Sequence, residues 1–238
     1  MNTNIQHLLY EGKAKKVYST DNPQHYIVEY KDEATAFNGT KKATLQGKGR
    51  LNNRISNTLM SYLNDHGIST HLIQEINPTQ TLVKPLKMFL LEVIVRNRAA
   101  GSICKRLRFE EGTLFTPPLV EFCYKKDALG DPFINDDHAR VLGLATSEEC
   151  ATIKTLALKI NALLEAYFQK LDIILVDFKL EFGKDAQGTI ILGDEVSPDT
   201  CRFWHAQSGE KLDKDRFRED LGGVCEAYEM ILNKISQG

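Results

Sequence analysis

The stretch VDFKLEFGKDAQGTIILGDEVSPD, residues 176–199, alternates apolar and polar side chains in its first half. This alternation is typical of a β-strand that packs one face into a core. The apolar face consists of Val176, Phe178, Leu180 and Phe182, and the polar face of Asp177, Lys179 and Glu181. A turn and a second apolar strand follow, ending at Asp194-Glu195. The stretch therefore predicts a hairpin with a row of charges on one face.

The position of the turn decides which of these charges meet. With a two-residue turn at Gln187-Gly188, the ladder places Glu181 directly opposite Asp194. Two facing carboxylates are unfavourable unless a cation lies between them, and Mg²⁺ is commonly held by one or two carboxylates plus nucleotide phosphates. A turn at Asp185-Ala186 would place Asp177 opposite Asp194 instead. Without a ligand, the charges would form the solvated face of an antiparallel sheet.

The composition excludes several classes of protein. The 238 residues are 42% hydrophobic and 26% charged, as in ordinary globular chains. A formal net charge of −2 gives no overall attraction for nucleic acid. The five cysteines form no CxxC pair, which indicates neither a zinc site nor a disulfide framework. We find no signal-peptide pattern and no apolar run of membrane-spanning length, so we expect a cytoplasmic protein without nucleic-acid or membrane partners.

The order of elements predicts an α+β protein with two lobes. Strands are expected at 7–20, 25–30, 70–76, 79–86 and 89–97, and helices at 51–63, 147–167 and about 216–235. A short helix or turn is expected at 99–109. The Lys84-Pro85 pair interrupts the chain between the two groups. We therefore expect an N-terminal β-rich lobe at 1–87 and a C-terminal lobe at 88–238.

Two basic segments are candidate anion sites. In YEGKAKKVY (10–18), Gly12 allows close backbone approach and the neighbouring lysines offer charges to a phosphate, although a solvated hairpin would have the same pattern. In VRNRAAGSICKRLR (95–108), Arg96 and Arg98 share a strand face, and Gly101-Ser102 follows at an expected helix start. The alternatives for this second segment are a plain basic surface or an RNA-binding patch.

Five motifs in register resemble one family. YEGKAKKVY, VRNRAAGS, LVDFKLEFG, LGDEVSPD with RFW, and DKDRFR followed by LGG are together similar to the SAICAR synthetases (phosphoribosylaminoimidazole-succinocarboxamide synthases), over residues 8 to 235. The resemblance implies an ATP-grasp-like fold with a kinase-like N-terminal lobe. It also implies a ligase that uses ATP and Mg²⁺ to join carboxyaminoimidazole ribonucleotide (CAIR) to L-aspartate, and a cytoplasmic homo-oligomer.

The resemblance also assigns roles to individual residues. The ATP-binding residues are Gly12, Lys13, Ala14, Lys15, Lys84, Met88 and Glu92, with Lys84 and Met88 at the adenine and Glu92 near the ribose. The magnesium ligands are Glu181 and Asp194. The residues that bind the ribonucleotide or other substrate anions are Arg96, Ser102, Arg202, Lys214 and Arg218. The catalytic residues are Lys179, Asp199 and Lys125, with Asp131 beside the site.

Phosphoryl transfer explains why such a site lacks a Ser-His or Cys-His pair, since it needs positioning and charge stabilisation rather than a protein nucleophile. The base that takes the amine proton is not identified by the sequence. Asn38 and Cys201 depart from the residues expected at their positions, and their roles are open. The main alternative is a Mg-ATP-dependent kinase of a small phosphorylated substrate, although HRD-like and DFG motifs are absent from the sequence.

Overall fold

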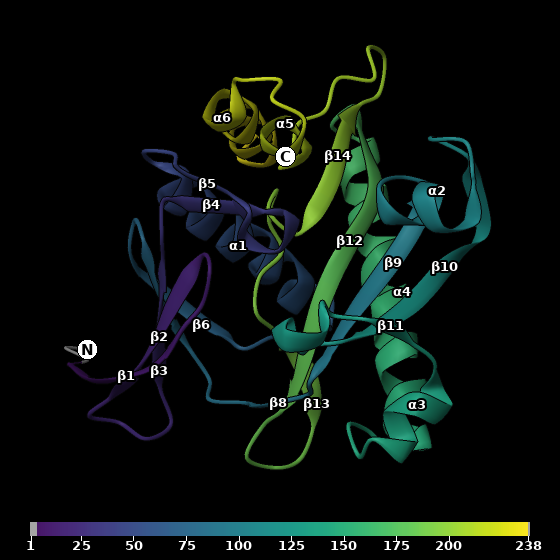
Figure 1. The fold of residues 1–238 in the computed structure, drawn as a ribbon. Coiled ribbons are helices and arrows are strands. Elements are labelled where there is room, and N and C mark those ends of the chain that lie inside the picture. Colours follow the sequence, from purple (N-terminus) through teal and green to yellow (C-terminus); the bar gives the residue numbers. More distant parts are fainter. Residues whose placement is uncertain (1–3, 238) are drawn as a thin grey trace.

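The N-terminal part of the chain forms an antiparallel sheet of five strands. The computed structural model describes residues 4–237, apart from the side chain of Asn38. The strand order is β1-β2-β3-β7-β6. The strands are β1 (Ile5–Glu11), β2 (Lys15–Thr20), β3 (Tyr26–Tyr30), β6 (Leu72–Asn77) and β7 (Gln80–Val83). The β1-β2 hairpin lies at the outer edge of this sheet, away from α4 (Figure 1).

A second sheet of seven strands forms the centre of the molecule. Its order is β11-β10-β9-β12-β13, and β14 and β8 also pair with β12. The strands are β8 (Lys87–Met88), β9 (Leu91–Arg98), β10 (Leu114–Tyr124), β11 (Phe133–Ile134), β12 (Ile173–Lys184), β13 (Ile190–Gly193) and β14 (Cys201–His205). Two short strands, β4 (Glu33–Ala36) and β5 (Lys41–Thr44), pair separately.

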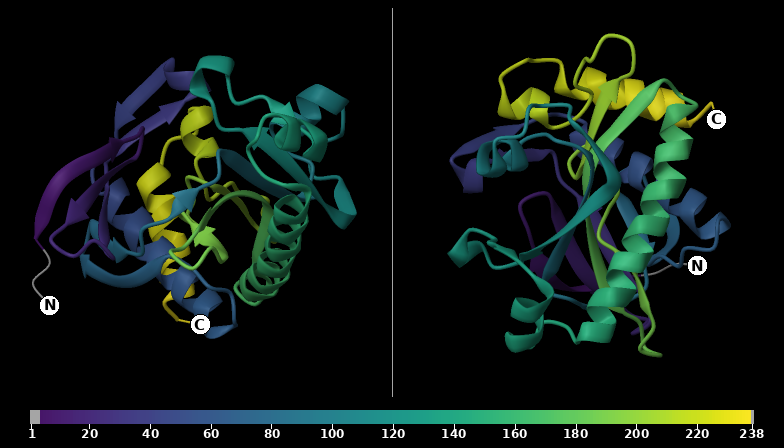
Figure 2. Two further views of the ribbon diagram at one scale, coloured as in Figure 1. Left: turned by 90° about the horizontal axis from the view of Figure 1, so that it is seen from below. Right: turned by 90° about the vertical axis from the view of Figure 1, so that its right-hand side faces the viewer.

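Helices cover the sheets from two directions. The helix α4 runs along one face of the central sheet, while α1 and α6 pack against each other (Figures 1 and 2). The helices are α1 (Lys48–Asp65), α2 (Ser102–Leu107), α3 (Asp136–Val141), α4 (Ser147–Gln169), α5 (Asp215–Arg218) and α6 (Val224–Ile235), with short 3₁₀ turns at Phe37–Gly39 and Asp127–Leu129. Within residues 4–237, no helix combines the length and apolarity needed to cross a membrane.

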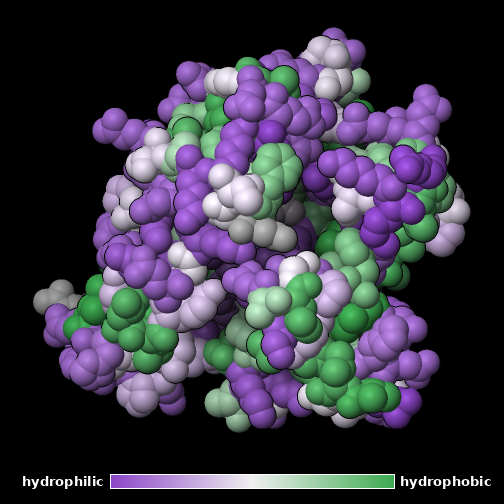
Figure 3. Space-filling model, in the orientation of Figure 1, coloured by the Kyte–Doolittle hydropathy of each residue, from purple (hydrophilic) through white to green (hydrophobic). Residues whose placement is uncertain are grey.

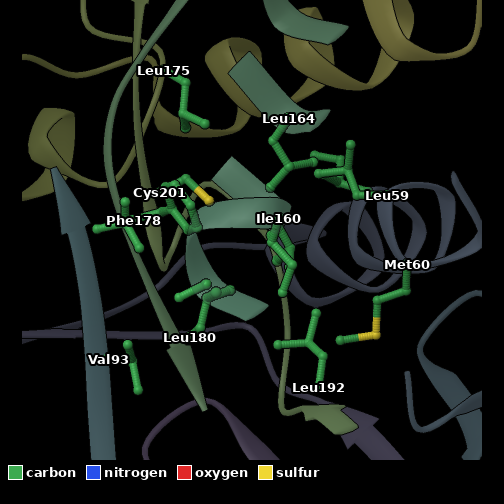
Figure 4. Close-up of a cluster of buried hydrophobic side chains, with 14 of the residues drawn as sticks. Leu59, Met60, Val93, Ile160, Leu164, Leu175, Phe178, Leu180, Leu192 and Cys201 are labelled. Atoms are coloured by element: carbon green, nitrogen blue, oxygen red, sulfur yellow. The ribbon is translucent and has the colours of Figure 1, made fainter. Parts of the chain in front are cut away.

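The alternating strand is confirmed as β12, and its apolar face builds the core. Its four predicted inward residues are each no more than 1% exposed. Phe178, Leu180 and Phe182 lie in the same buried cluster as Ile160 and Leu164 of α4 (Figure 4). Val176 is not part of this cluster, because a register shift between Leu175 and Asp177 interrupts the alternation. The predicted helix from Ser147 is also confirmed, because Thr146 and Glu149 form a reciprocal capping box at its first turn.

The register of the hairpin differs from both predicted turns. Glu181 pairs with Gly193, and the last pair is Lys184 with Ile190, which leaves a five-residue loop at 185–189. The carboxylate of Asp185 stabilises this loop by accepting the N–H groups of Gln187 (3.0 Å) and Thr189 (2.8 Å). Neither Glu181 nor Asp177 therefore lies directly opposite Asp194, which follows β13 with a φ of +54°.

The predicted helix at 216–235 is also wrong in its first part. It is divided into α5 and α6 by Gly222 and Gly223, which adopt positive φ values of 68° and 61°. Leu221, in the segment between the two helices, is 50% exposed. The periodicity of apolar residues continued across the break, but two adjacent glycines favour a turn over a continuous helix.

Candidate active site

A deep cleft lies between the β1-β2 hairpin and the polar face of β12. We use "the cleft" for this cavity of about 790 Å³. One wall comes from the β1-β2 turn (Tyr10 to Lys15), from β4 and from the turn after β4. The other wall comes from β12, from the segments that follow β10 and β13, and from α5. The face seen in Figure 3 is largely hydrophilic and is hollowed near its middle. This volume is typical of sites for small ligands and cofactors.

Glu181, on β12, lies at the centre of a group of charges. Its carboxylate accepts hydrogen bonds from Lys179 and from Lys125, although the side chain itself is almost fully buried. Lys179 also donates to Glu92 on β9 at 3.1 Å. Burial alone would lower the pKa of Lys179, but the surrounding carboxylates raise it well above its ordinary value. The lysine is therefore a fixed positive charge.

Asp194 forms the second half of this group. It accepts a hydrogen bond from Lys15 of β2 and lies 3.6 Å from the Nζ of Lys179. Lys15 also contacts Glu195 at 2.7 Å. Burial opposes ionisation of Asp194, but Lys15 and Lys179 hold its pKa well below the usual range. Lys179 therefore joins Glu181 and Asp194 in one group of charges.

The polar face of β12 is therefore not a solvated surface. Asp177 is 3% exposed and Glu181 2% exposed. Burying a carboxylate is expensive unless it is paired and hydrogen-bonded, and here every buried charge of the strand has a partner of opposite sign.

A smaller cavity of about 220 Å³, "the side chamber", adjoins the cleft. The two cavities share Lys179, Asp199, Thr200 and Arg218. The other walls of the side chamber include Arg96, Ser102 and Arg202. A ligand in the cleft and a ligand in the side chamber would thus meet beside Lys179 and Asp199.

Buried acids hold the arginines of the side chamber in place. Asp177 accepts hydrogen bonds from Arg96 at 2.6 Å and from Arg202 at 2.9 Å. Arg96 also donates to Glu121 (2.7 Å) and to the hydroxyl of Ser102 (3.0 Å). These contacts orient planar guanidinium groups that suit a phosphate or carboxylate.

Asp215 completes this arrangement. It accepts hydrogen bonds from Arg202 at 2.6 Å and from Arg218. Gly101 is required beside them, because it has a φ of +60° and a Cβ there would lie 2.4 Å from a guanidinium nitrogen of Arg202. The backbone thus approaches the arginine more closely than any other residue type would allow.

Asp199 is held by two helices that are distant in the sequence. Lys48, at the start of α1, donates to it at 2.8 Å, and Tyr228 of α6 donates to it at 2.7 Å. Lys214 lies 3.8 Å away. Burial opposes ionisation of Asp199, but Lys214 and Lys48 hold its pKa well below the usual range.

Asp213 is a buried acid next to the side chamber. It accepts the backbone N–H groups of Phe203 (2.9 Å) and Asp215 (2.7 Å) and thereby fixes β14 against α5. Burial, together with the charge of Asp215, raises the pKa of Asp213 to about 7. The carboxyl group is therefore on the point of losing its proton at neutral pH.

Most of the predicted site residues lie together. The predicted residues that line the cleft or the side chamber are Gly12, Lys13, Ala14, Lys15, Glu92, Arg96, Ser102, Lys125, Asp131, Lys179, Glu181, Asp194, Asp199, Arg202, Lys214 and Arg218. Lys84 and Met88 are not among the lining residues that the structure describes for either cavity. Met88 packs over Gly183 and Gly193, where an added Cβ would lie about 3 Å from its side chain.

Arg98 does not join Arg96 in the side chamber. It donates to the carbonyl of Gly112 at 3.2 Å instead. The thiol of Cys201 is buried, and burial raises its pKa far above the ordinary value, so it stays protonated. Asn38 has a side chain outside the described part of the structure.

Several residues with clear roles were not assigned from the sequence. Glu195 shares Lys15 with Asp194, and the adjacent acids in DEVSPD were the available signal. Lys48 lies before the helix expected at 51–63, and no pattern in the sequence singled it out. Tyr228 was expected in a helix core, and it is buried there, but its hydroxyl group reaches Asp199.

The donor set fits a magnesium ion that is shared with a nucleotide. Within the described residues, no cluster of three or more His, Cys, Asp or Glu forms a metal site made of protein alone. Glu181 and Asp194 both face the cleft, however, and both have oxygen ligands of the kind that Mg²⁺ prefers. One or two carboxylates with phosphate oxygens are the usual set for this ion.

Comparison with known proteins agrees with these features. The family model described as SAICAR synthetase matches residues 8–235. The chain belongs to the SAICAR synthetase family. The phosphoribosylaminoimidazole-succinocarboxamide synthase of Caldanaerobacter subterraneus subsp. tengcongensis is 58% identical over 230 residues, which cover 97% of each chain.

Solved structures of the family share the fold. The enzyme of that name from Ehrlichia chaffeensis has 46% identity and a TM-score of 0.95, with 97% of this chain and 98% of that chain covered. A SAICAR synthetase solved in complex with ADP has 51% identity and a TM-score of 0.93, with 96% and 97% covered. The predicted two-lobed, ATP-grasp-like α+β fold is thereby confirmed.

The raised pKa of Asp213 predicts a specific dependence of stability on pH. The folded-state pKa lies above the unfolded value, so the protonated group favours the fold at low pH, and this contribution is lost as pH rises through about 7. The wild type should therefore lose free energy of unfolding between pH 5 and pH 8, whereas Asp213→Asn should not. The difference between variant and wild type should shift in favour of the variant at pH 8. Urea unfolding at both pH values measures this. If the free energies of unfolding of variant and wild type differed by the same amount at both pH values, the prediction would be wrong. Asp65 is exposed, so Asp65→Asn is the control.

Proposed function

We propose that this chain joins the carboxylate of CAIR to the amine of L-aspartate, and that it converts ATP to ADP and phosphate in doing so. Membership of the SAICAR synthetase family supports this ligase activity in purine biosynthesis. The structural observation that carries the proposal is the junction of the two cavities at Lys179 and Asp199. A nucleotide in the cleft would there meet an anionic substrate in the side chamber.

The chemistry requires activation of a carboxylate. A free carboxylate is a poor acyl donor, because its leaving group would be oxide. Transfer of the γ-phosphoryl group of ATP to CAIR gives an acyl phosphate, which the aspartate amine can attack. The step depends on positioning and on positive charge around the transferred group. Lys15, Lys125 and Lys179 supply fixed positive charges along the cleft.

The β1-β2 hairpin is proposed to cover the phosphates. The backbone from Gly12 to Lys15 lines the cleft, and Lys13 is held at its edge by Asp127 at 2.9 Å. Lys84 and Met88 are proposed at the adenine, and Glu92 near the ribose. Lys84 and Met88 lie outside the described cleft wall, so this part of the proposal rests on the sequence resemblance.

Glu181 and Asp194 would hold Mg²⁺, which would supply positive charge against the negative charge of the phosphates. Because these carboxylates now bind Lys15, Lys125 and Lys179, those lysines are free to turn to the phosphates when the carboxylates take another partner. The same set of charges would thus serve the site with and without a nucleotide.

The arginines of the side chamber are proposed to bind CAIR. Arg96, Arg202 and Arg218 are clustered there with the hydroxyl group of Ser102. Lys179 and Asp199 lie where the carboxylate to be activated would face the cleft. We also propose the lobe boundary at 87/88, a cytoplasmic location and a homo-oligomer, as expected from the sequence.

One assay tests the function directly. Release of phosphate and ADP from ATP is measured with CAIR, aspartate or Mg²⁺ omitted in turn. The ligase should require all three for sustained turnover. ADP formation that needs one acceptor and no aspartate would identify a kinase instead, and the absence of any ATP turnover would refute both activities.

The metal assignment predicts the effect of neutral variants. Glu181→Gln and Asp194→Asn keep the size of the side chain but remove the charge that would bind Mg²⁺. We expect each to fold and to lose turnover by about 10²-fold or more, as when one strong electrostatic interaction is removed. Steady-state rates over a range of Mg²⁺ concentrations test this, with Glu75→Gln in the exposed Arg54 pair as the control. Full activity at ordinary Mg²⁺ would rule out the assignment.

The side chamber predicts selective loss of CAIR affinity. Arg96 is unsuitable for this test because its removal would leave Asp177 with a single partner in a buried site. Ser102→Ala removes one hydroxyl group and should raise the KM for CAIR about tenfold or more, since a hydrogen bond to a charged group contributes about 1.5–3 kcal/mol. The KM for ATP should change little. An equal change in both constants would contradict the placement.

A further inference from the structure

Lys214 differs from the other lysines of the cleft. Lys13, Lys15, Lys125 and Lys179 each donate a hydrogen bond to a carboxylate. Within residues 4–237, the Nζ of Lys214 has no hydrogen-bond acceptor, and its nearest acid is Asp199 at 3.8 Å. The side chain is nevertheless only 15% exposed. A lysine this well buried without a bonded carboxylate needs an explanation.

The reason is that Asp199 is already engaged. Lys48 binds one of its oxygens at 2.8 Å, and the hydroxyl group of Tyr228 binds the other at 2.7 Å. Both partners are themselves no more than 1% exposed, so neither is free to move away. Lys48 and Tyr228 thus prevent Asp199 from forming a close ion pair with Lys214.

Burial, more than the surrounding charges, lowers the pKa of Lys214. Lys48 from α1 and Arg218 from α5 are cations that face it, while Asp199 and, further away, Glu195 oppose them. Tyr228 of α6 faces the same group through Asp199 and is protonated, because burial and the Asp199 charge raise its pKa well above the ordinary value. Burial lowers the pKa of Lys214 most strongly; Asp199 opposes this effect, and Lys48 and Arg218 add to it.

Lys214 also lies where a nucleophile would approach. It lines the cleft beside Asp199, one of the residues shared with the side chamber. An amine that attacks an acyl group at that junction arrives as an ammonium ion and must first lose a proton. Lys13, Lys15 and Lys179 have raised pKa values and are poor acceptors for it.

We propose that Lys214 is the base that removes a proton from the α-ammonium group of aspartate. This role rests on the ligase activity proposed above and goes beyond anion binding. In its unprotonated form, the Nζ takes one proton and becomes an ammonium. The amine nitrogen then forms the C–N bond to the acyl carbon, the bond from that carbon to the phosphate oxygen breaks, and the leaving phosphate takes the electron pair and the second amine proton. Lys214 afterwards returns its proton to solvent.

Lys214→Arg separates this role from charge alone, since arginine carries a permanent positive charge but cannot give up its proton in a protein. The kcat with aspartate should fall about 10²- to 10⁴-fold at neutral pH, as expected when general-base catalysis is lost. The deficit should shrink as pH rises, because free aspartate then supplies its own neutral amine. Hydroxylamine, which is largely unprotonated at neutral pH, should still support ADP release with CAIR and ATP.

Tyr228→Phe provides a second test that keeps Lys214. It frees one oxygen of Asp199, which can then pair with Lys214 and favour the ammonium form. The pH profile of kcat should shift to higher pH. Tyr167→Phe is the matched control. The hydroxyl group of Tyr167, on α4, donates to the carbonyl of Ile235 at the end of α6 at 3.0 Å and does not contact Asp199. Its profile should not move.

Other outcomes would overturn the proposal. A Lys214→Arg deficit that is constant with pH, or that is equal for aspartate and hydroxylamine, would show that Lys214 only binds anions or supports the fold. An unchanged pH profile in Tyr228→Phe would do the same. Failure of the ligase activity itself would be seen separately, as wild-type protein that releases no ADP when all three substrates are present.

Discussion

The pairing of buried lysines with buried carboxylates along β12 is the interaction on which the rest of the site depends. Desolvating one such charge without a partner would cost several kcal/mol. Lys179 lies between Glu181 and Asp194, and Lys15 and Lys125 bind the outer sides of these acids. The buried charges along this strand are therefore paired with one another. The cleft can exchange internal partners for phosphates and a divalent ion without first creating unpaired charges.

The same principle operates in the side chamber and links distant parts of the chain. Asp177 and Asp215 hold the arginines, and neither acid was assigned a role from the sequence. The packing of α1 against α6 brings Lys48 and Tyr228 to Asp199. Elements from both ends of the chain therefore meet at the point where the two cavities join, which explains why the family motifs extend over nearly the whole sequence.

The sequence predicted what is local and periodic. The alternation of β12 and the spacing of α4 were correct, because burial on one side imposes a period of two on a strand and about 3.6 on a helix. The predicted hairpin register was wrong because Asp185 stabilises a five-residue loop. The predicted last helix was wrong in its first part because two glycines interrupt an apolar pattern. Lys48 and Tyr228 were unpredictable in role, since their contacts with Asp199 exist only after helices distant in the sequence have packed.

The exchange of charge partners is most directly tested by a crystal structure of this protein with Mg²⁺ and a non-hydrolysable ATP analogue. The account predicts that Lys15 and Lys179 bind phosphate oxygens in that complex, and that positions 181 and 194 both coordinate the ion. Intact lysine–carboxylate pairs beside a bound nucleotide, with the ion held elsewhere, would contradict it.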